Sequence, residues 1–446
     1  MLMKKAIIIN ILILSIQSFS QNYWQTVFPP SEYRPKVEIL YNDTINDILY
    51  AAGNIMINSK ADSIIILRYK NNVWDTLPAI FDATVKDMIL FHGELYIAGG
   101  FTYIDTTKFC GITKYTNNNF YNVGNGFCYN NENGGVGKLK IINDTLYAMG
   151  YFKGSGEKEI NNIAKWNGVK WQNVYNFPDY GFASVVYDIN IFNNEIFVGG
   201  NFHSDTLDDF IKYDGQNWVK PKLDVYGSLS AVSFIDIYQD KMFVGGNLCE
   251  AQGTYIAMYD GSKWFTDGFQ PSLGVTLCSK EYNNELYIGG KFSDFGGMPA
   301  QYIVKWDGAQ FCKLQGALDL GERVLDIEFY HDTLYTCSGN SINYYTGSFY
   351  SDTCFVWNNI DEKKIQKNSI TIYPNPTNST FNIKLNTKTP LEIEISIFSI
   401  NGNQIFEKHF YQTNKIRINN LHLEKGVYFV ELKTDELVKT KKLIIN

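Results

Sequence analysis

Short apolar segments recur along the chain at a nearly constant spacing. One of them, of the form Leu-Tyr-Ile-Gly-Gly, appears seven times at intervals of 44 to 51 residues. Its copies begin at Leu49, Leu95, Leu146, Ile196, Met242, Leu286 and Leu334. A looser segment of alternating apolar and polar residues precedes each copy, and an apolar segment with a turn and a final aromatic residue follows it. Alternation of this kind predicts β-strands, and no long segment after residue 25 shows helical periodicity.

Each repeat therefore predicts four short strands joined by turns. Asn-Gly and Asp-Gly pairs, which supply the positive φ angles of tight hairpins, separate the third strand from the fourth. These turns begin at Asn167, Asp214, Asp260 and Asp307. Four strands at this period are typical of β-propeller blades. We expect an all-β chain in which residues 21–358 form a seven-bladed β-propeller.

Two ways of closing this ring remain open. Residues 23–27, Tyr-Trp-Gln-Thr-Val, match the fourth-strand segment Lys-Trp-Gln-Asn-Val at residues 170–174, although they precede the first complete repeat. They could supply the missing outer strand of the last blade. Alternatively, the last blade takes its own fourth strand near residues 348–353, and residues 23–27 only cover an edge.

The repeats resemble those of kelch-like and galactose-oxidase-like propellers. Residues 196–202 with 163–171, and residues 286–292 with 303–311, carry the resemblance. The matching residues are glycines, turn residues and packing aromatics, so the resemblance implies a fold and leaves function open. The copper site of galactose oxidase, with two histidines and a tyrosine crosslinked to cysteine, cannot be placed in this sequence.

The two ends of the chain differ from the repeats. Residues 1–20 have the layout of a secretory signal peptide: Lys4 and Lys5, an apolar run of about eleven residues, and a cleavage site between Ser20 and Gln21. The run is too short to span a bilayer, which needs roughly 20 apolar residues, so no transmembrane segment is expected after signal removal. Residues 359–369 are polar and charged and read as a linker. Residues 370–446 alternate like strands between turns and predict a small Ig-like β-sandwich.

The C-terminal residues, from about 368 to 446, resemble the type A sorting domain of the type IX secretion system. Four ordered segments carry the resemblance: Tyr-Pro-Asn-Pro, a hairpin with Asn-Gly, Gly-Val-Tyr, and the terminal Lys-Lys-Leu-Ile-Ile. The matching residues are Tyr373, Pro374, Asn375, Pro376, Gly402, Gly426, Val427, Tyr428 and Lys442. The resemblance implies export across the outer membrane by the type IX machinery, with its sortase as a partner. The resemblance also implies later attachment to the cell surface or release.

Charge argues against two classes of partner. The formal net charge is −7 and charged residues are 19% of the chain, with lysines and arginines scattered singly. Nucleic-acid binding rests on clustered basic residues, so we expect no nucleic-acid partner. The sequence also lacks a polybasic segment of the kind that binds anionic membrane surfaces.

The seven cysteines allow disulfides in an oxidising compartment. They are Cys110, Cys128, Cys249, Cys278, Cys312, Cys337 and Cys354. Nearness in sequence favours the pairs Cys110–Cys128 and Cys337–Cys354, although spacing does not determine connectivity and burial as small apolar residues is an equal alternative.

Candidate catalytic groups are few. His92 and His331 lie at corresponding turns between the first and second strands, and His203 lies in a loop, so we expect no catalytic or metal-binding histidine set. Three aspartates, Asp87, Asp188 and Asp326, recur eight residues before the Leu or Ile of their repeats. They could form a partial acidic ring at the rim of the channel, or they could make hydrogen bonds at strand ends.

Calcium is the one cofactor that the loops suggest. Several aspartates follow the second strands, without the spacing of an EF-hand. They are Asp105, Asp205, Asp208, Asp209 and Asp294.

The sequence thus favours a secreted or cell-surface propeller that binds a glycan or protein ligand without catalysis. One alternative is an extracellular glycan lyase or hydrolase with two carboxylates at the channel. The other is a purely structural surface-layer protein.

Overall fold

The computed structural model confirms the all-β expectation: every regular element in the part of the chain that it describes is a strand. The described residues are 23–27, 33–34, 36–57, 63–129, 132–175, 177–178, 184–203, 208–221, 231–249, 254–266, 271, 274–308, 310–314, 323–347, 354–355, 370–373, 375, 377, 380–385, 391–399, 404–413, 415–419, 423–434 and 437–445. Contacts divide the chain into two units, Met1–Val356 and Trp357–Asn446. The expected signal peptide and linker lie outside the described residues.

The first unit contains, within its described residues, six four-stranded sheets and one five-stranded sheet, all antiparallel. Each begins with the looser segment of its repeat. These first strands are β3 (Val37–Asp43), β8 (Val85–Phe91), β16 (Gly135–Ile142), β22 (Val185–Phe192), β26 (Ala231–Tyr238), β30 (Gly274–Tyr282) and β36 (Asp326–Tyr330).

All seven Leu-Tyr-Ile-Gly-Gly segments are strands, as their alternation predicts. These second strands are β4 (Ile48–Gly53), β9 (Glu94–Gly99), β17 (Thr145–Tyr151), β23 (Glu195–His203), β27 (Lys241–Cys249), β31 (Glu285–Phe292) and β37 (Thr333–Cys337). The third strands are β6 (Leu67–Lys70), β12 (Ile112–Thr116), β20 (Ile163–Trp166), β24 (Asp208–Tyr213), β28 (Thr254–Tyr259), β34 (Ile303–Trp306) and β38 (Ile342–Tyr345).

Six of the fourth strands are β7 (Val73–Thr76), β13 (Asn119–Asn122), β21 (Trp171–Asn173), β25 (Trp218–Val219), β29 (Trp264–Phe265) and β35 (Phe311–Lys313). Fourth strands β21, β25, β29 and β35 follow tight turns in which glycine has a positive φ, as at Gly168 (90°) and Gly215 (101°), whereas asparagines with positive φ form the turns before β7 and β13. Glycine adopts this conformation without the clash that a Cβ atom would cause. Short ribbons are formed by β2 (Tyr33–Arg34) with β5 (Met56–Ile57), β10 (Tyr103–Ile104) with β11 (Thr107–Lys108), β14 (Cys128–Tyr129) with β15 (Glu132–Asn133), β18 (Gly154–Ser155) with β19 (Lys158–Glu159), and β32 (Asp294–Phe295) with β33 (Met298–Pro299).

The seventh sheet takes its outer strand from the N-terminal end of the described chain. Strand β1 (Trp24–Val27) pairs with β38, with Trp24 opposite Tyr345 and Val27 opposite Ile342. The Trp24 ring is buried and lies 4.9 Å from the Tyr345 ring. The first way of closing the last sheet is therefore the one adopted. Strand β39 (Cys354–Phe355) instead pairs with β35 as a fifth strand of the preceding sheet, and residues 348–353 lie outside the described residues.

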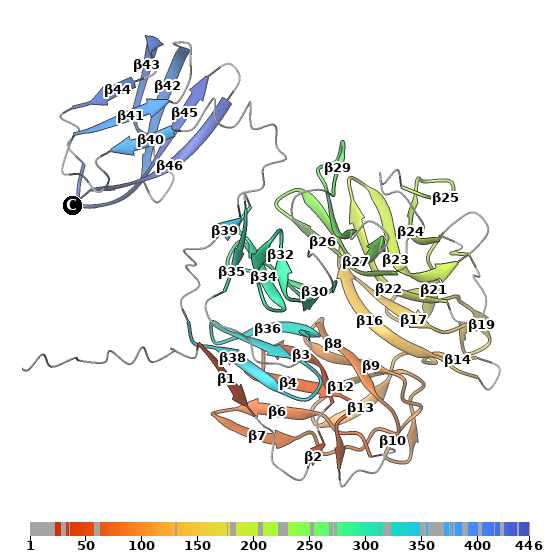
Figure 1. The fold of residues 1–446 in the computed structure, drawn as a ribbon. Helices are drawn as coiled ribbons and strands as arrows, with labels where there is room; N and C mark the ends of the chain where they lie inside the picture. The colour runs from red at the N-terminus through yellow and green to blue at the C-terminus, as the bar shows by residue number, and fades with distance from the viewer. Residues whose placement is uncertain are drawn as a thin grey trace, which may run out of the picture. The chain divides into compact units, whose positions relative to one another are not determined.

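The first strands form a closed circuit of contacts, in which each contacts the first strand of the next sheet and β36 contacts β3. They lie around a common centre, with the later strands of each sheet outside them (Figure 1). Apolar clusters fill the spaces between consecutive sheets. Tyr50 of the first sheet and Ile66, just before β6, pack for example with Met88 and Ile97 of the second sheet. Sheets that pack on both faces in this way explain the high aromatic content of the repeats.

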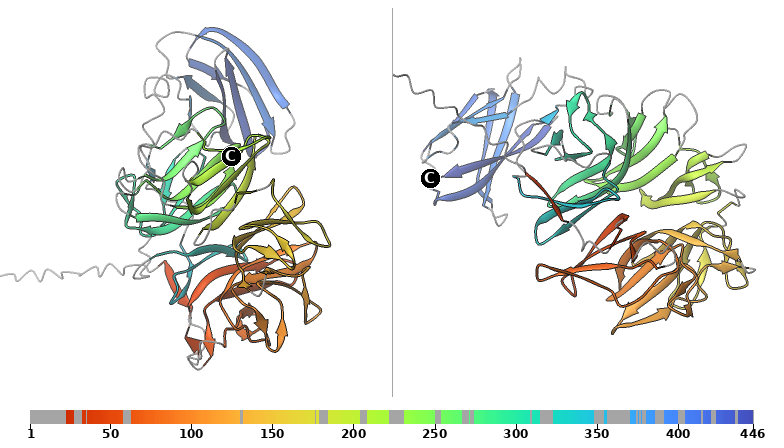
Figure 2. Two further views of the ribbon diagram at one scale, coloured as in Figure 1. Left: turned by 90° about the vertical axis from the view of Figure 1, so that its right-hand side faces the viewer. Right: turned by 60° about the horizontal axis from the view of Figure 1, so that its bottom comes forward.

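The second unit contains a three-stranded and a four-stranded antiparallel sheet (Figure 2). The first has the order β40 (Ile370–Tyr373), β41 (Phe381–Leu385), β44 (Lys415–Ile418). The second has the order β43 (Gln404–Thr413), β42 (Leu391–Ser399), β45 (Gly426–Thr434), β46 (Leu437–Ile445). Buried side chains of both sheets, such as Phe381, Ile395 and Leu443, share one apolar core.

Candidate functional site

The three aspartates singled out by their repeat position all bridge neighbouring first strands. In each, one carboxylate oxygen accepts the backbone N–H of the following residue, and the other accepts a backbone N–H from the adjacent sheet. The donors are Met88 and Leu139 for Asp87, Ile189 and Ile235 for Asp188, and Ile327 and Leu40 for Asp326, at 2.6–2.9 Å. Each carboxyl group thus joins two first strands through backbone hydrogen bonds. Asp87 and Asp188 lie within their strands, and Asp326 begins β36.

A β-bulge lies next to Asp87 and next to Asp188. The register between the first and second strands shifts between Val85 and Asp87, and again between Val186 and Asp188. The glycine that ends the second-strand motif makes room there: a Cβ atom on Gly200 would lie 2.1 Å from the carbonyl oxygen of Val185. Bulges often re-aim a side chain in this way.

Burial raises the pKa of two of these aspartates. It raises the pKa of Asp326 from 3.8 to about 7, although the N–H of Leu40 and nearby lysines act in the opposite direction. Burial also raises the pKa of Asp87. Desolvation disfavours a carboxylate, and here it outweighs the hydrogen bonds that favour one.

Two lysines of β16 complete a charged cluster at the centre of the circuit. The ammonium group of Lys140 donates to both carboxylate oxygens of Asp188 (3.0 Å), to the carbonyl of Ile235 (2.7 Å) and to Asp236 (3.1 Å). One side chain thereby joins three consecutive sheets. Burial acts to raise the pKa of Asp236, but Lys140, the Ser279 hydroxyl and Lys138 together hold it below its usual value.

Lys138 stands two residues earlier and interacts electrostatically with four carboxyl groups. Burial acts to lower its pKa, but Asp188, Asp87, Asp236 and Asp326 raise it well above the usual value for lysine. We call Lys138, Lys140 and these four aspartates the central charge cluster. Sequence reasoning missed both lysines. One signal is visible afterwards: Lys138 follows the bulge of its strand at the position that Asp87 and Asp188 occupy in their own repeats.

The remaining junctions between first strands are also bridged by polar side chains. Leu90 donates its backbone N–H to the hydroxyl of Tyr41 (2.6 Å), and Lys280 donates to Glu328 (2.8 Å). Ser279 and Asp236 are hydrogen-bonded across the next junction. With the aspartate bridges and the Lys140–Asp188 pair, every one of the seven junctions in the circuit carries at least one such bond.

The predicted histidines lie at turns. His92 and His331 both have a positive φ. The Nε2 atom of His92 lies 2.9 Å from a carboxylate oxygen of Asp144, and that of His331 lies 2.6 Å from one of Asp47. Both aspartates are exposed and belong to the next sheet. The side chain of His203 lies outside the described residues. Among described residues, no group of three or more His, Cys, Asp or Glu is arranged to hold a metal ion.

The three calcium candidates whose side chains are described belong to different repeats: Asp105 lies between β10 and β11, Asp209 lies in β24, and Asp294 lies in β32. Asp105 accepts the N–H of Ile80, and Asp209 accepts that of Phe202. A hydrogen bond joins Asp294 to the neighbouring Ser293. Asp205 and the side chain of Asp208 lie outside the described residues.

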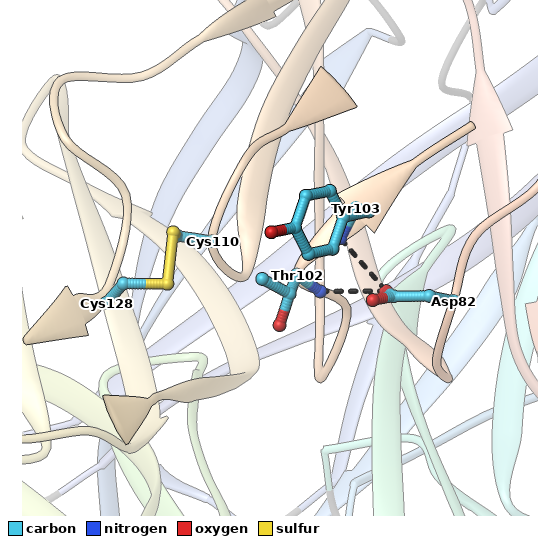
Figure 3. The surroundings of a disulfide bond; sticks show 5 residues. All are labelled: Asp82, Thr102, Tyr103, Cys110 and Cys128. Carbon is cyan, nitrogen blue, oxygen red and sulfur yellow. Dashed lines mark hydrogen bonds between the residues drawn. A yellow bond between two sulfur atoms is a disulfide. The ribbon is translucent and has the colours of Figure 1, made fainter. Parts of the chain in front are cut away.

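One predicted disulfide is confirmed and the other is wrong. Cys110 and Cys128 are bonded and tie the segment before β12 to the β14–β15 ribbon; nearby, Asp82 accepts the N–H groups of Thr102 and Tyr103 (Figure 3). Cys337 is a buried free thiol rather than the partner of Cys354. Cys312 is disulfide-bonded, and the register of β35 and β39 places residue 354 opposite it.

In the second unit, the Tyr-Pro-Asn-Pro segment lies against the last strand. The side-chain oxygen of Asn375 accepts the N–H of Ile444 (2.9 Å), and the N–H of Thr377 donates to the carbonyl of Ile444 (2.9 Å). Tyr373 ends β40 and is partly exposed.

The later residues of the motif lie on the two strands that follow. Gly426, Val427 and Tyr428 begin β45, and the Tyr428 hydroxyl donates to the carbonyl of Glu424 (2.9 Å). The backbone of Lys442 lies in β46 opposite Phe429. Pro374, Pro376 and Gly402 lie outside the described residues.

A family model matches this second unit and identifies it. Residues 371–446 are a secretion system C-terminal sorting domain. A sorting domain of the type IX system indicates secretion, with attachment to the cell surface or release outside the cell, and it implies interaction with the type IX machinery. No described helix is long and apolar enough to cross a membrane. No curated protein matches the chain in sequence.

Several solved structures resemble the chain at low identity. The extracellular domain of a protein assigned as a hybrid two-component system of Bacteroides thetaiotaomicron is 11% identical, with a TM-score of 0.49. That of a one-component system from the same organism is 9% identical, with a TM-score of 0.47. Both matches cover 95% of this chain and 58% of the other, so the chain spans less than two thirds of the proteins it resembles. A further protein of unknown function from that organism is 10% identical over 67% of this chain and 84% of its own, with a TM-score of 0.34.

Proposed function

We propose that the first unit is a kelch-like, seven-bladed β-propeller that binds a glycan at the cell surface or in the medium without catalysis. In this proposal the signal peptide is removed between Ser20 and Gln21. The Ig-like sorting domain then directs the chain through the type IX machinery to its sortase. The observation that carries the proposal is the closed circuit of first strands, bridged at every junction by polar side chains, because such a ring is a rigid support for variable loops.

The carboxylates at the centre support binding over catalysis. Asp87, Asp188 and Asp326 each use both oxygens to accept backbone hydrogen bonds, and Lys140 also binds Asp188. A glycosidase needs one carboxylic acid and one carboxylate that face the substrate. Groups committed to holding strands together are poorly suited to that role.

Exposed tyrosines favour a glycan as the ligand. Tyr103, on the β10–β11 ribbon, and Tyr175, after β21, expose 43% and 48% of their surface. Tyr175 also stacks on Tyr213 at 4.7 Å, which holds its ring in place. Flat aromatic faces pack well against the apolar faces of sugar rings, and a fixed ring loses little entropy on binding.

The test is binding of the mature chain, residues 21–446, to a broad glycan array with and without calcium. We expect saturable binding to a defined glycan, reduced at least tenfold by Tyr103→Ala or Tyr175→Ala. Tyr373→Ala, which removes an exposed tyrosine of the sorting domain, is the matched control and leaves binding unchanged. A dependence on calcium would assign it a role in the loops. Silence under both conditions would overturn the glycan proposal in favour of a protein partner or a structural surface-layer role, and release of sugar fragments would indicate an enzyme.

A further inference from the structure

Among the described residues, the last strand of the sorting domain has hydrogen bonds on both sides near its end. Strand β46 lies at the edge of its sheet and pairs with β45 along its whole length. Near the end, both backbone groups of Ile444 point away from β45 and are taken by the 375–377 segment. Asn375 accepts the Ile444 N–H, and Thr377 donates to its carbonyl. A parallel bridge joins Thr377 to Ile445.

We call Asn375 and Thr377, which bind the backbone of Ile444, the clamp, and the two residues differ in exposure. Thr377 is buried, and its hydroxyl donates to the carbonyl of Thr380 at 2.7 Å, which fixes the segment from within. Asn375 is exposed and reaches β46 with its side-chain oxygen. The apolar side chains on either side of Ile444, Leu443 and Ile445, are buried in the core, so the clamp and the core hold the same three residues.

From this geometry we propose that Asn375 is a positioning residue for export: it clamps the end of β46 so that the secretion machinery meets an ordered C-terminal strand. The inference rests on the proposed export by the type IX system. An edge strand that is paired on one side only opens locally, or frays, more easily than a strand held on both sides. A receptor that binds a frayed strand must also supply the entropy of ordering it, which weakens binding. Because the clamp already orders the end of β46, the secretion machinery does not have to supply this entropy when it binds.

The test uses the full chain, expressed in a bacterium with a type IX system, and compares three variants. Asn375→Ala removes the acceptor for the Ile444 N–H, whereas Asn375→Asp keeps an oxygen in its place. Asn382→Ala is the matched control because, among the described residues, its side-chain hydrogen bond goes to the carbonyl of Tyr373 in β40 (3.2 Å) and not to β46. The two readouts are hydrogen exchange of the Ile444 amide in purified protein and the fraction of the chain that reaches the surface or medium.

We expect Asn375→Ala to speed exchange of the Ile444 amide about fivefold, the loss of one typical hydrogen bond, and to reduce export severalfold. Asn375→Asp restores both, and Asn382→Ala changes neither. The proposal is overturned if Asn375→Ala exports normally, if its Ile444 amide exchanges at the wild-type rate, or if Asn382→Ala lowers export equally. Failure of the wild-type chain to be exported would instead overturn the proposed export itself, while the exchange data would still report on the clamp.

Discussion

The carboxylate of Asp326 in β36 accepts the backbone N–H of Leu40 in β3 at 2.8 Å, so one side chain joins the last sheet of the first unit to the first. The same carboxylate accepts the N–H of Ile327 (2.9 Å). Replacing Asp326 with alanine leaves both donors without this acceptor. We expect the free energy of unfolding to fall by about 1–3 kcal/mol for each donor left buried and unsatisfied, measured by denaturant titration. A loss below the error of the titration would contradict the bridging role.

The raised pKa of Asp326 predicts a pH dependence. Burial raises this pKa from 3.8 to about 7 in the folded protein. Between these two pH values, the carboxyl group is protonated in the folded state and ionised in the unfolded chain. The group therefore contributes its full stability below about pH 4 and loses it as the pH rises towards 7. We expect the difference in unfolding free energy, wild type minus Asp326→Asn, to decrease over that range. A difference that is flat or increases with pH would show that the carboxyl group is ionised when buried.

The central charge cluster predicts a large effect from one lysine. Lys140→Met leaves Asp188, which is almost fully buried, without its hydrogen-bonded cation and is expected to cost about 3–5 kcal/mol in unfolding free energy. The double variant Lys140→Met/Asp188→Asn should recover part of that loss. Lys114→Met is the control, because Lys114 pairs with Glu94 at a more exposed site and should cost less than about 1 kcal/mol. Equal costs for the two lysines would rule out a special role for the cluster.

Because Trp24 of β1 is buried, we expect its replacement to lower the free energy of unfolding as much as replacement of a core residue does. Trp24→Ala removes a buried ring from the space against Tyr345 and is expected to cost about 3–5 kcal/mol. Gln25→Ala, on the exposed side of the same strand, should change the unfolding free energy by less than about 0.5 kcal/mol. Comparable thermal midpoints for the two variants would mean that β1 is dispensable.

The cysteines predict a peptide map with one confirmed and one inferred crosslink. Cys110 and Cys128 should be recovered together, and Cys278 and Cys337 should react with an alkylating reagent only after unfolding, because both thiols are buried. Cys312 is expected to be linked to Cys354, which the strand register places opposite it. Recovery of Cys312 joined to Cys249 would contradict this assignment. Loss of the first disulfide through Cys110→Ser should cost about 2–4 kcal/mol.

Local patterns predicted much of the strand structure and little of what joins the sheets. The Leu-Tyr-Ile-Gly-Gly segments are strands, and Gly168 and Gly215 have the positive φ angles that their turns require, because both properties depend on residues close in sequence. The aspartate positions were also visible as a repeat. Their partners were not, since the N–H of Leu40 is 286 residues from Asp326 and is found only once the sheets are placed in order.

The errors have the same origin. Nearness in sequence suggested that Cys337 pairs with Cys354, yet Cys337 ends a second strand in the last sheet, and residue 354 lies on a strand that pairs with the preceding sheet. Lys138 and Lys140 looked like two scattered cations because the carboxylates around them come from other repeats. Sequence periodicity describes a repeat unit, whereas these contacts depend on differences between repeats.

The pairing of β1 with β38 has a consequence for how the protein is made. Its first strand meets a partner more than 300 residues later, as the Thr26–Asn343 hydrogen bond shows with a separation of 317 residues. Contacts between such distant segments require closure of a very long loop, and they make folding slow. The last sheet cannot be completed during synthesis of the earlier repeats, and any chain that stops short of β38 leaves β1 without a partner. The pairing of β1 with β38 can therefore form only after all seven repeats have been synthesised.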